Sequence, residues 1–332
     1  MPSIPTTILV APDSFKGTLS AREVATAVGR GLEQGGWEVE LCPVADGGEG
    51  TLDVLLGALG GELVTVSASD PLGRGIDAAF GLSDDGTGRR VAIVETAAAS
   101  GLGLVAPEER DPLAASTRGT GELVVAAALA GATTIYLGVG GSATTDGGAG
   151  AIEAIEEAGG LGAARLVVLS DVRTPFEQAA RVYGPQKGAG DAELRRLTSR
   201  LHALARGFNR DPRGVPMTGA AGGLSGGLWA RFGASLVPGA AFVLDLLDFD
   251  RRMRKARAVV TGEGRLDQQS LAGKAVSEVA TRARQAGVPC HAIVGKRRLD
   301  AFGARILDLQ AVLEAGAPRT LTSAGRRLAG LI

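Results

Sequence analysis

Short apolar runs alternate with helical patterns over the first sixty residues, and this alternation limits the fold most strongly. Residues 6–11 (TTILVA) are apolar and β-branched, as is typical of a strand buried in a parallel sheet. Ser20 and Glu23 have the spacing of a capping box that begins a helix. A second strand at 37–44 and a second helix at 51–59 follow. This βαβα order predicts a doubly wound parallel sheet.

The pattern changes in the middle of the chain and returns at its end. Three short strands joined by turns, typical of hairpins, are expected between residues 62 and 96. A strand, a helix and a strand are expected again from residue 256 to residue 294. We therefore expect an α/β protein of two domains. A discontinuous Rossmann- or flavodoxin-like domain with a parallel sheet would comprise residues 1–61 and 236–332, and a mixed α/β domain, 62–235, would be inserted in it.

Charge and hydropathy exclude several classes of partner. The 35 basic and 36 acidic residues give a formal charge of -1, which does not indicate a nucleic-acid-binding protein. No apolar run reaches the roughly 18 residues of a membrane span. The first residues lack the charged and apolar regions of a signal peptide, so we expect a cytoplasmic protein without a membrane partner.

Acidic residues recur directly after the predicted strands. In open α/β sheets ligands bind beyond the carboxyl ends of the strands. Five such ends carry an aspartate, four of them in glycine-rich loops: Asp13, Asp46, Asp146, Asp171 and Asp267. A single Asp-Gly pair is usually only a turn. Their repetition at one topological position predicts a functional site.

The residue types at these ends indicate phosphate chemistry. Backbone amides of glycine-rich loops bind phosphate oxygens. Carboxylates would repel a nearby polyphosphate unless a divalent cation lay between them, and Mg²⁺ suits this position. A lysine can neutralise the transferring group, and Lys16, Lys187 and Lys274 are candidates.

Neither familiar phosphate motif explains the loop Gly138–Gly150 (GVGGSATTDGGAG). The P-loop pattern is absent, since Lys274 is followed by alanine rather than Ser or Thr. The dinucleotide pattern matches Gly138, Gly140 and Ala143, but no strand-end acid follows about twenty residues later. This partial match leaves an NAD(P)-dependent dehydrogenase of a small hydroxy acid as one alternative function. A non-catalytic sugar-acid-binding protein is a second alternative.

Taken together, the loops resemble those of the bacterial glycerate kinases that make 2-phosphoglycerate. The matching stretches occur in order along nearly the whole chain: APDSFKGTLSA (11–21), PVADGGEGT (43–51), ETAAASGL (95–102), STRGTGEL (116–123), GVGGSATTDGGAG (138–150), YGPQKGA (183–189), GAAGGL (219–224) and VTGEGRLDQQSLAGK (260–274). The resemblance implies an enzyme that transfers the γ-phosphoryl group of ATP, with Mg²⁺ as cofactor, to a hydroxyl of D-glycerate. It also implies an active site in the cleft between two α/β domains.

The resemblance also suggests roles for individual residues. Asp46 or Asp171 would position the attacking hydroxyl, and Lys16 would neutralise charge on the phosphoryl group. Arg118, or the amides around Gly141 and Ser142, would hold the glycerate carboxylate. The remaining candidates are Ser14, Asp146 and Lys187 for substrate, Gly47, Gly48, Gly262, Glu263 and Gly264 for nucleotide, and Glu263 and Asp267 for metal. Whether the loop at 138–150 binds glycerate or ATP phosphate stays open, with glycerate favoured.

The chain also departs from the family pattern. It is short between residues 158 and 182, it has Asp171-Val-Arg-Thr174-Pro where the family usually has Asp-Val-x-Asn-Pro, and its C-terminus is abbreviated. The regiochemistry is not fixed by the residues, and a homodimer is compatible with them.

Overall fold

The computed structural model describes residues 6–84 and 86–332. The chain divides into two compact units, one of Met1–Asp46 with Ala240–Ile332 and one of Gly47–Gly239. The predicted class is confirmed: a discontinuous unit with a parallel sheet and an inserted unit with a mixed sheet.

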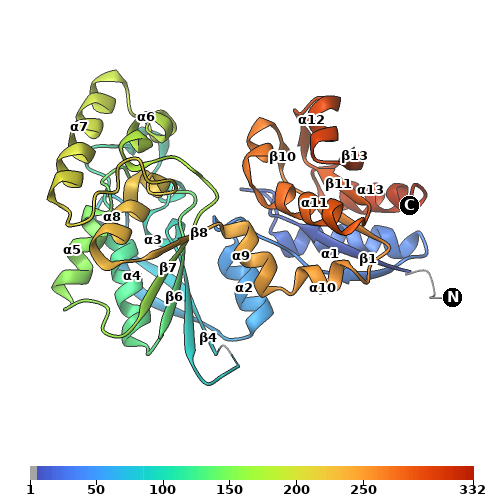
Figure 1. The fold of residues 1–332 in the computed structure, drawn as a ribbon, viewed down its shortest axis with the longest axis horizontal. Helices are drawn as coiled ribbons and strands as arrows, with labels where there is room; N and C mark the ends of the chain where they lie inside the picture. The colour runs from blue at the N-terminus through green and yellow to red at the C-terminus, as the bar shows by residue number, and fades with distance from the viewer. Residues whose placement is uncertain (1–5, 85) are drawn as a thin grey trace. The chain divides into compact units, whose positions relative to one another are not determined.

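A parallel five-stranded sheet in the order β13-β11-β9-β1-β2 forms the centre of the first unit (Figure 1). Numbered by their order within this unit, its strands run 2-1-3-4-5, which is the flavodoxin-like order. The elements are β1 (Thr7–Pro12), α1 (Ala21–Gln34), β2 (Glu38–Leu41), α9 (Gly239–Leu246), α10 (Phe249–Met253), β9 (Ala258–Gly262), α11 (Ala275–Ala286), β11 (Cys290–Val294), α12 (Ala301–Ile306), β13 (Leu309–Glu314) and α13 (Pro318–Ala329). The short strands β10 (Arg265–Leu266) and β12 (Lys296–Arg297) pair with each other.

Helices cover both faces of this sheet. Leu9 and Val259 pack with residues of α9, α10 and α11, whereas Val10 and Val260 pack with α1 and α13. Successive strand residues point to opposite faces. A strand covered on both faces is therefore apolar at nearly every position, which explains the continuous apolar run that predicted β1.

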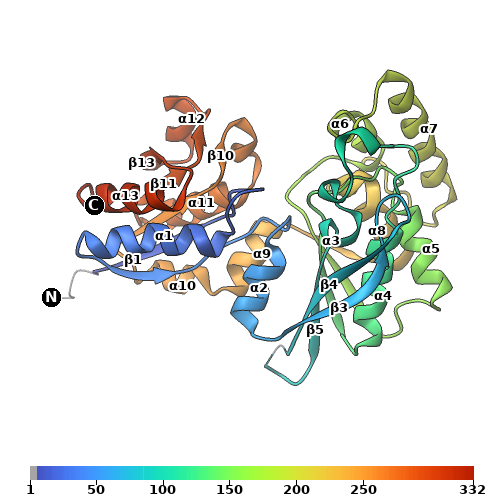
Figure 2. The same ribbon diagram turned by 180° about the vertical axis from the view of Figure 1, so that it is seen from behind.

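A six-stranded mixed sheet in the order β3-β4-β5-β6-β7-β8 forms the second unit. The predicted hairpins are confirmed, since β3, β4 and β5 pair antiparallel, with β3 and β4 side by side in Figure 2. Strands β5 to β8 are parallel. The elements are α2 (Thr51–Leu59), β3 (Glu62–Ser69), β4 (Gly75–Asp84), β5 (Arg90–Glu95), α3 (Ala97–Ser100), α4 (Arg118–Leu129), β6 (Thr134–Gly138), α5 (Ala149–Glu157), β7 (Arg165–Leu169), α6 (Ala179–Tyr183), α7 (Asp191–Gly207), α8 (Leu224–Phe232) and β8 (Ser235–Val237), with short 3-10 helices between them.

The boundaries of the two units differ from the expected 1–61, 62–235 and 236–332. Helix α2 contacts β4 and β5, which places it in the second unit. Strand β8 pairs with β7, so the second unit extends to Gly239. Both differences arise from packing between segments that are distant in the sequence.

The predicted capping box at the start of α1 is present. The Ser20 hydroxyl accepts a hydrogen bond from the Glu23 amide at 3.2 Å, and the Glu23 carboxylate accepts one from the Ser20 amide at 2.8 Å. We expect Ser20→Ala to lower the free energy of unfolding by about 1 kcal/mol, measured by urea denaturation. Arg30→Ala, at an exposed position of the same helix, is the control and should change it by less than about 0.5 kcal/mol. Equal effects of the two substitutions would contradict the capping role.

Candidate active site

The first unit has a pocket at the point where its strand order reverses. Strands β1 and β9 are neighbours, with Pro12 paired to Gly262 at their carboxyl ends, and the loops that follow diverge from there. A pocket of about 480 Å³ lies at this point. Ligands of open α/β sheets bind at such a position. The charged residues that line it are Asp13, Lys16, Asp46, Glu263, Arg265, Asp267, Lys274 and Lys296.

Lys16 and Asp46 form an ion pair in this pocket. Lys16 Nζ lies 3.2 Å from Asp46 Oδ2, and the Lys16 side chain is 49% exposed whereas that of Asp46 is 9% exposed. Burial lowers the pKa of Lys16, but the carboxylates of Asp46 and Asp13 outweigh it and hold the pKa above its usual value. The ammonium is therefore charged at neutral pH and accessible from the pocket, as a group that neutralises a phosphoryl oxygen must be.

Asp13 was noted in the sequence as a strand-end aspartate but was given no role, and it lines the pocket. It is buried, and its Oδ1 accepts a hydrogen bond from the Ser14 amide at 2.6 Å. Burial raises the pKa of Asp13, and the neighbouring Asp46 carboxylate raises it further. Its position directly after β1 is the same strand-end signal that singled out the other aspartates.

Ser14 and Glu263 carry buried polar atoms without hydrogen-bond partners, namely Ser14 Oγ and Glu263 Oε1. Burial raises the pKa of Glu263 to about 7. Buried polar groups are almost always paired in folded proteins. Both residues line the same pocket, so a polar ligand bound there would supply the hydrogen-bond partners that these two atoms lack.

Several other predicted residues have local structural contacts. Asp267 Oδ1 accepts the Gln269 amide at 2.9 Å and caps a short 3-10 helix. A Cβ at Gly262 would lie 2.1 Å from the carbonyl oxygen of Ile293, so strand packing requires this glycine. A Cβ at Gly264 would lie 3.3 Å from the Phe15 Cα.

Lys274 and Lys296 add positive charge to the pocket lining. Lys274 was a sequence candidate, but Lys296 was missed although it closely follows the strand β11. Inspection of every strand end for lysine as well as aspartate would have found it. The lining thus contains four acidic and four basic side chains, a mixture suited to a phosphate chain with a cation.

In the second unit, the predicted glycine-rich loop lies between segments that are distant in the sequence. The Ala143 amide donates to the Ser100 carbonyl at 2.9 Å, and the Leu102 amide donates to the Gly141 carbonyl at 2.8 Å. The Gly147 amide donates to the Gly222 carbonyl at 3.1 Å. The stretches 95–102, 138–150 and 219–224, which were singled out separately in the sequence, are thus parts of one assembly.

The glycines of this loop and of Gly47-Gly48 permit close approach of backbone to backbone. A Cβ at Gly138 would lie 2.9 Å from the Gly47 carbonyl oxygen, and one at Gly140 would lie 2.5 Å from the Gly48 Cα. A Cβ at Gly47 would lie 2.9 Å from the Leu169 carbonyl. Chain packing accounts for these glycines without a nucleotide.

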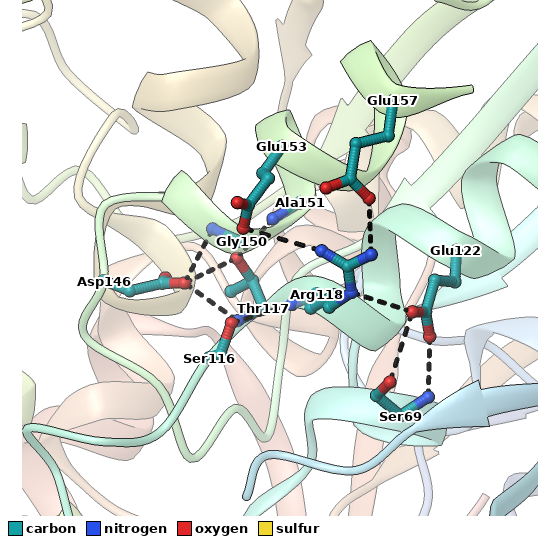
Figure 3. Close-up of polar contacts among 10 residues, drawn as sticks. All are labelled: Ser69, Ser116, Thr117, Arg118, Glu122, Asp146, Gly150, Ala151, Glu153 and Glu157. Carbon is teal, nitrogen blue, oxygen red and sulfur yellow. Dashed lines mark hydrogen bonds and ion pairs between the residues drawn. The ribbon is translucent and has the colours of Figure 1, made fainter. Parts of the chain in front are cut away.

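The Asp146 carboxylate accepts hydrogen bonds from other groups of the protein (Figure 3). Its Oδ2 accepts the amide and the hydroxyl of Thr117, each at 2.8 Å, and the Gly150 amide at 3.2 Å, and its Oδ1 accepts the Gly148 amide at 3.1 Å. These bonds join the start of α4 to the start of α5. Asp146 therefore has a structural role in the loop, and its predicted contact with substrate has no support from these contacts.

Arg118 lies among three carboxylates (Figure 3). Its guanidinium contacts Glu122 on its own helix and Glu153 and Glu157 on α5. The distances to Glu122 and Glu153 are 3.2 and 3.5 Å. The predicted binding of a glycerate carboxylate by Arg118 stays a prediction, and these contacts favour a role in joining α4 to α5.

Lys187 contacts the same loop from the segment before α7. It is 3% exposed, and its Nζ donates to Ser142 Oγ at 2.9 Å and to the Thr144 carbonyl at 2.5 Å. Ser142 is also buried, whereas Gly141 beside it is exposed. The structure therefore brings together three of the predicted substrate residues, Gly141, Ser142 and Lys187.

Asp171, which follows β7, is half-buried.

The chain is similar to known proteins over most of its length. A model of the glycerate kinase family matches residues 8–159 and 158–326. A glycerate kinase of Halalkalibacterium halodurans is 40% identical over 326 residues, covering 87% of this chain and 85% of that protein. The glycerate 2-kinase of Escherichia coli K12 is 38% identical over 325 residues, covering 87% and 84%.

A solved structure agrees with these relatives. A crystal structure from Salmonella typhimurium LT2, given provisionally as glycerate kinase 2, is 35% identical and covers 98% of both chains with a TM-score of 0.82. The chain therefore belongs to the glycerate kinase family, which consists of phosphotransferases with an alcohol group as acceptor.

Proposed function

We propose that the protein transfers the γ-phosphoryl group of ATP, with Mg²⁺, to the C2 hydroxyl of D-glycerate and so makes 2-phosphoglycerate. Membership of the family supports phosphorylation of glycerate. The name of the Escherichia coli relative, glycerate 2-kinase, supports the C2 position.

The observation that carries the proposal is the Lys16–Asp46 pair in the pocket beyond β1 and β9. Phosphoryl transfer needs an orienting group for the hydroxyl and positive charge near the transferring group. In the proposed reaction Asp46 accepts the hydroxyl proton as the hydroxyl oxygen bonds to the γ-phosphorus. The bond from that phosphorus to the β-phosphate bridging oxygen breaks, and ADP leaves. Lys16 neutralises the phosphoryl oxygens. Asp171 is the alternative residue for positioning the hydroxyl.

Glu263 and Asp267 would hold Mg²⁺, and the amide of Gly264 beside Glu263 would serve the nucleotide. The described residues contain no group of three or more His, Cys, Asp or Glu side chains arranged for a metal. Mg²⁺ fits the pocket nevertheless, because it needs only one or two carboxylates beside waters and phosphate oxygens. The unpartnered Oε1 of Glu263 is a suitable ligand atom. Bound Mg²⁺ would neutralise phosphate charge.

The two alternative functions receive less support. Gly138 and Gly140, which suggested a dinucleotide site, pack against the backbone of Gly47 and Gly48. A binding protein that lacks catalysis would not require the charged Lys16–Asp46 pair beside other acidic side chains.

A coupled assay for ADP release tests the proposal. We expect turnover that requires D-glycerate, ATP and Mg²⁺ together, that is lost on adding EDTA, and that L-glycerate does not support. Oxidation of D-glycerate with NAD⁺ and no ATP would instead favour the dehydrogenase. Binding of glycerate with no release of ADP would favour the binding protein.

A cytoplasmic location and a homodimer stay predictions. Across residues 6–84 and 86–332, no helix has the length and apolar character to cross a membrane. Sedimentation of the purified protein would determine the oligomeric state.

A further inference from the structure

Lys187 is a buried cation whose direct partners are neutral oxygens. Its Nζ donates to the Ser142 hydroxyl and the Thr144 carbonyl, and the side chain is almost inaccessible to solvent. No ion pair to Lys187 occurs in the described part of the chain. Burying an ammonium without a counter-charge is costly. Such a charge is expected where an anionic ligand supplies the compensation.

The hydrogen bond from Lys187 determines what Ser142 can do. The charged form of Lys187 has donors and no acceptor, so Ser142 Oγ then accepts this bond, and its own O–H is left to donate. Within residues 6–84 and 86–332, no acceptor for that proton is seen. Ser142 follows Gly141, which is exposed and has a φ of +70°. The hydroxyl is thus a donor polarised by a cation, on a buried residue that directly follows an exposed one.

We propose that Lys187 is a positioning residue that holds Ser142 as a hydrogen-bond donor to the carboxylate of a small hydroxy acid. The inference rests on the proposed function for the identity of that acid, D-glycerate. Lys187 acts through Ser142 and stabilises the bound anion through its charge. The same two residues fix the conformation of the segment from Gly141 to Thr144.

The electrostatic surroundings of Lys187 agree with this role. Burial lowers the pKa of Lys187 to about 7, and the negative charge of Asp146 opposes that shift. The adjacent helix α6 contributes Arg181 and Tyr183, and Arg110 approaches Gly188, so these neighbours add no further carboxylate. A bound carboxylate would favour the charged ammonium. Glycerate binding above about pH 7 should therefore take up a proton, and should weaken as the pH rises further.

Steady-state kinetics of Lys187→Met, Ser142→Ala and the double variant test the proposal. Loss of a hydrogen bond to a charged group should raise the KM for D-glycerate by about 10-fold or more in each single variant and leave the KM for ATP nearly unchanged. Because the two residues act in series, the double variant should be little worse than either single one. Thr198→Val, which removes a hydroxyl on α7 that donates to the Leu194 carbonyl at 2.7 Å, is the control and should retain the wild-type KM. An unchanged KM for glycerate in Lys187→Met, or fully additive effects, would overturn the proposal.

Calorimetry separates this inference from the proposed function. D-glycerate is titrated into the full-length protein at pH 8 in two buffers of different ionisation enthalpy. We expect proton uptake in the wild type and none in Lys187→Met. Proton uptake of equal size in both proteins would overturn the role of Lys187 even if the enzyme is active. If the wild type binds D-glycerate with proton uptake but releases no ADP, the proposed kinase activity fails while the role of Lys187 stands. Absence of D-glycerate binding to the wild type, with or without MgATP, would overturn both.

Discussion

Asp46→Asn and Lys16→Ala should each lower kcat for D-glycerate phosphorylation by about 10²-fold or more. The asparagine keeps the shape of Asp46 but cannot accept the hydroxyl proton, and general-base catalysis is typically worth 10²–10⁴-fold. Loss of the Lys16 ammonium removes the charge that opposes the phosphoryl oxygens. The coupled assay at saturating ATP and glycerate measures both effects.

An exposed ion pair of the same unit provides the matched control for these variants. Arg251 and Asp248 contact each other with side chains that are 64% and 53% exposed. Arg251→Ala and Asp248→Asn remove the same kinds of charge away from the pocket, and should leave kcat within about twofold because exposed ion pairs contribute little. Near-wild-type kcat in both Asp46→Asn and Lys16→Ala would remove these residues from the mechanism.

Gly222→Ala should cause the largest loss of stability, about 2–5 kcal/mol in the free energy of unfolding. Gly222 has a φ of +65°, and a Cβ there would lie 2.0 Å from the Thr144 carbonyl oxygen. The left-handed conformation costs a non-glycine residue roughly 1–2 kcal/mol, and forcing the loop aside typically adds about 1–3 kcal/mol.

Gly233→Ala isolates the conformational part of this cost. Gly233 has nearly the same φ, +66°, but a Cβ there would have nothing within 4 Å. Urea denaturation of the two variants should therefore give the smaller loss for Gly233→Ala. Equal losses would mean that Gly222 does not pack against Thr144 in solution.

Local sequence signals predicted most helices and strands, because their apolar residues recur with a clear period and their ends carry capping or turn residues. Helix α2 begins and ends where it was expected, at 51–59. Strand β8 was missed, since its three residues are too few to show a period. The first domain boundary differs from the expected one because α2 packs against β4 and β5 and therefore belongs to the second unit.

The position of the site was predictable in the same way, but the roles of its residues were not. Strand ends pointed to Asp46, which lines a pocket beyond the carboxyl ends of β1 and β9, where ligands of such sheets bind. Asp146 accepts hydrogen bonds from Thr117, which is 29 residues away, and Arg118 contacts carboxylates on α5. Such contacts depend on tertiary packing, so sequence patterns could not separate residues that join helices from residues that line the pocket.

The most direct test of the central claim is a ³¹P NMR spectrum recorded with the full-length protein, ATP, Mg²⁺ and D-glycerate. We predict loss of the γ-phosphorus signal of ATP and a new phosphomonoester signal that is a doublet when protons are not decoupled, because the C2 phosphate is coupled to one hydrogen. A triplet would show transfer to the C3 hydroxyl and contradict the proposed 2-phosphoglycerate product. Unchanged ATP signals would contradict the account of this protein as a glycerate kinase.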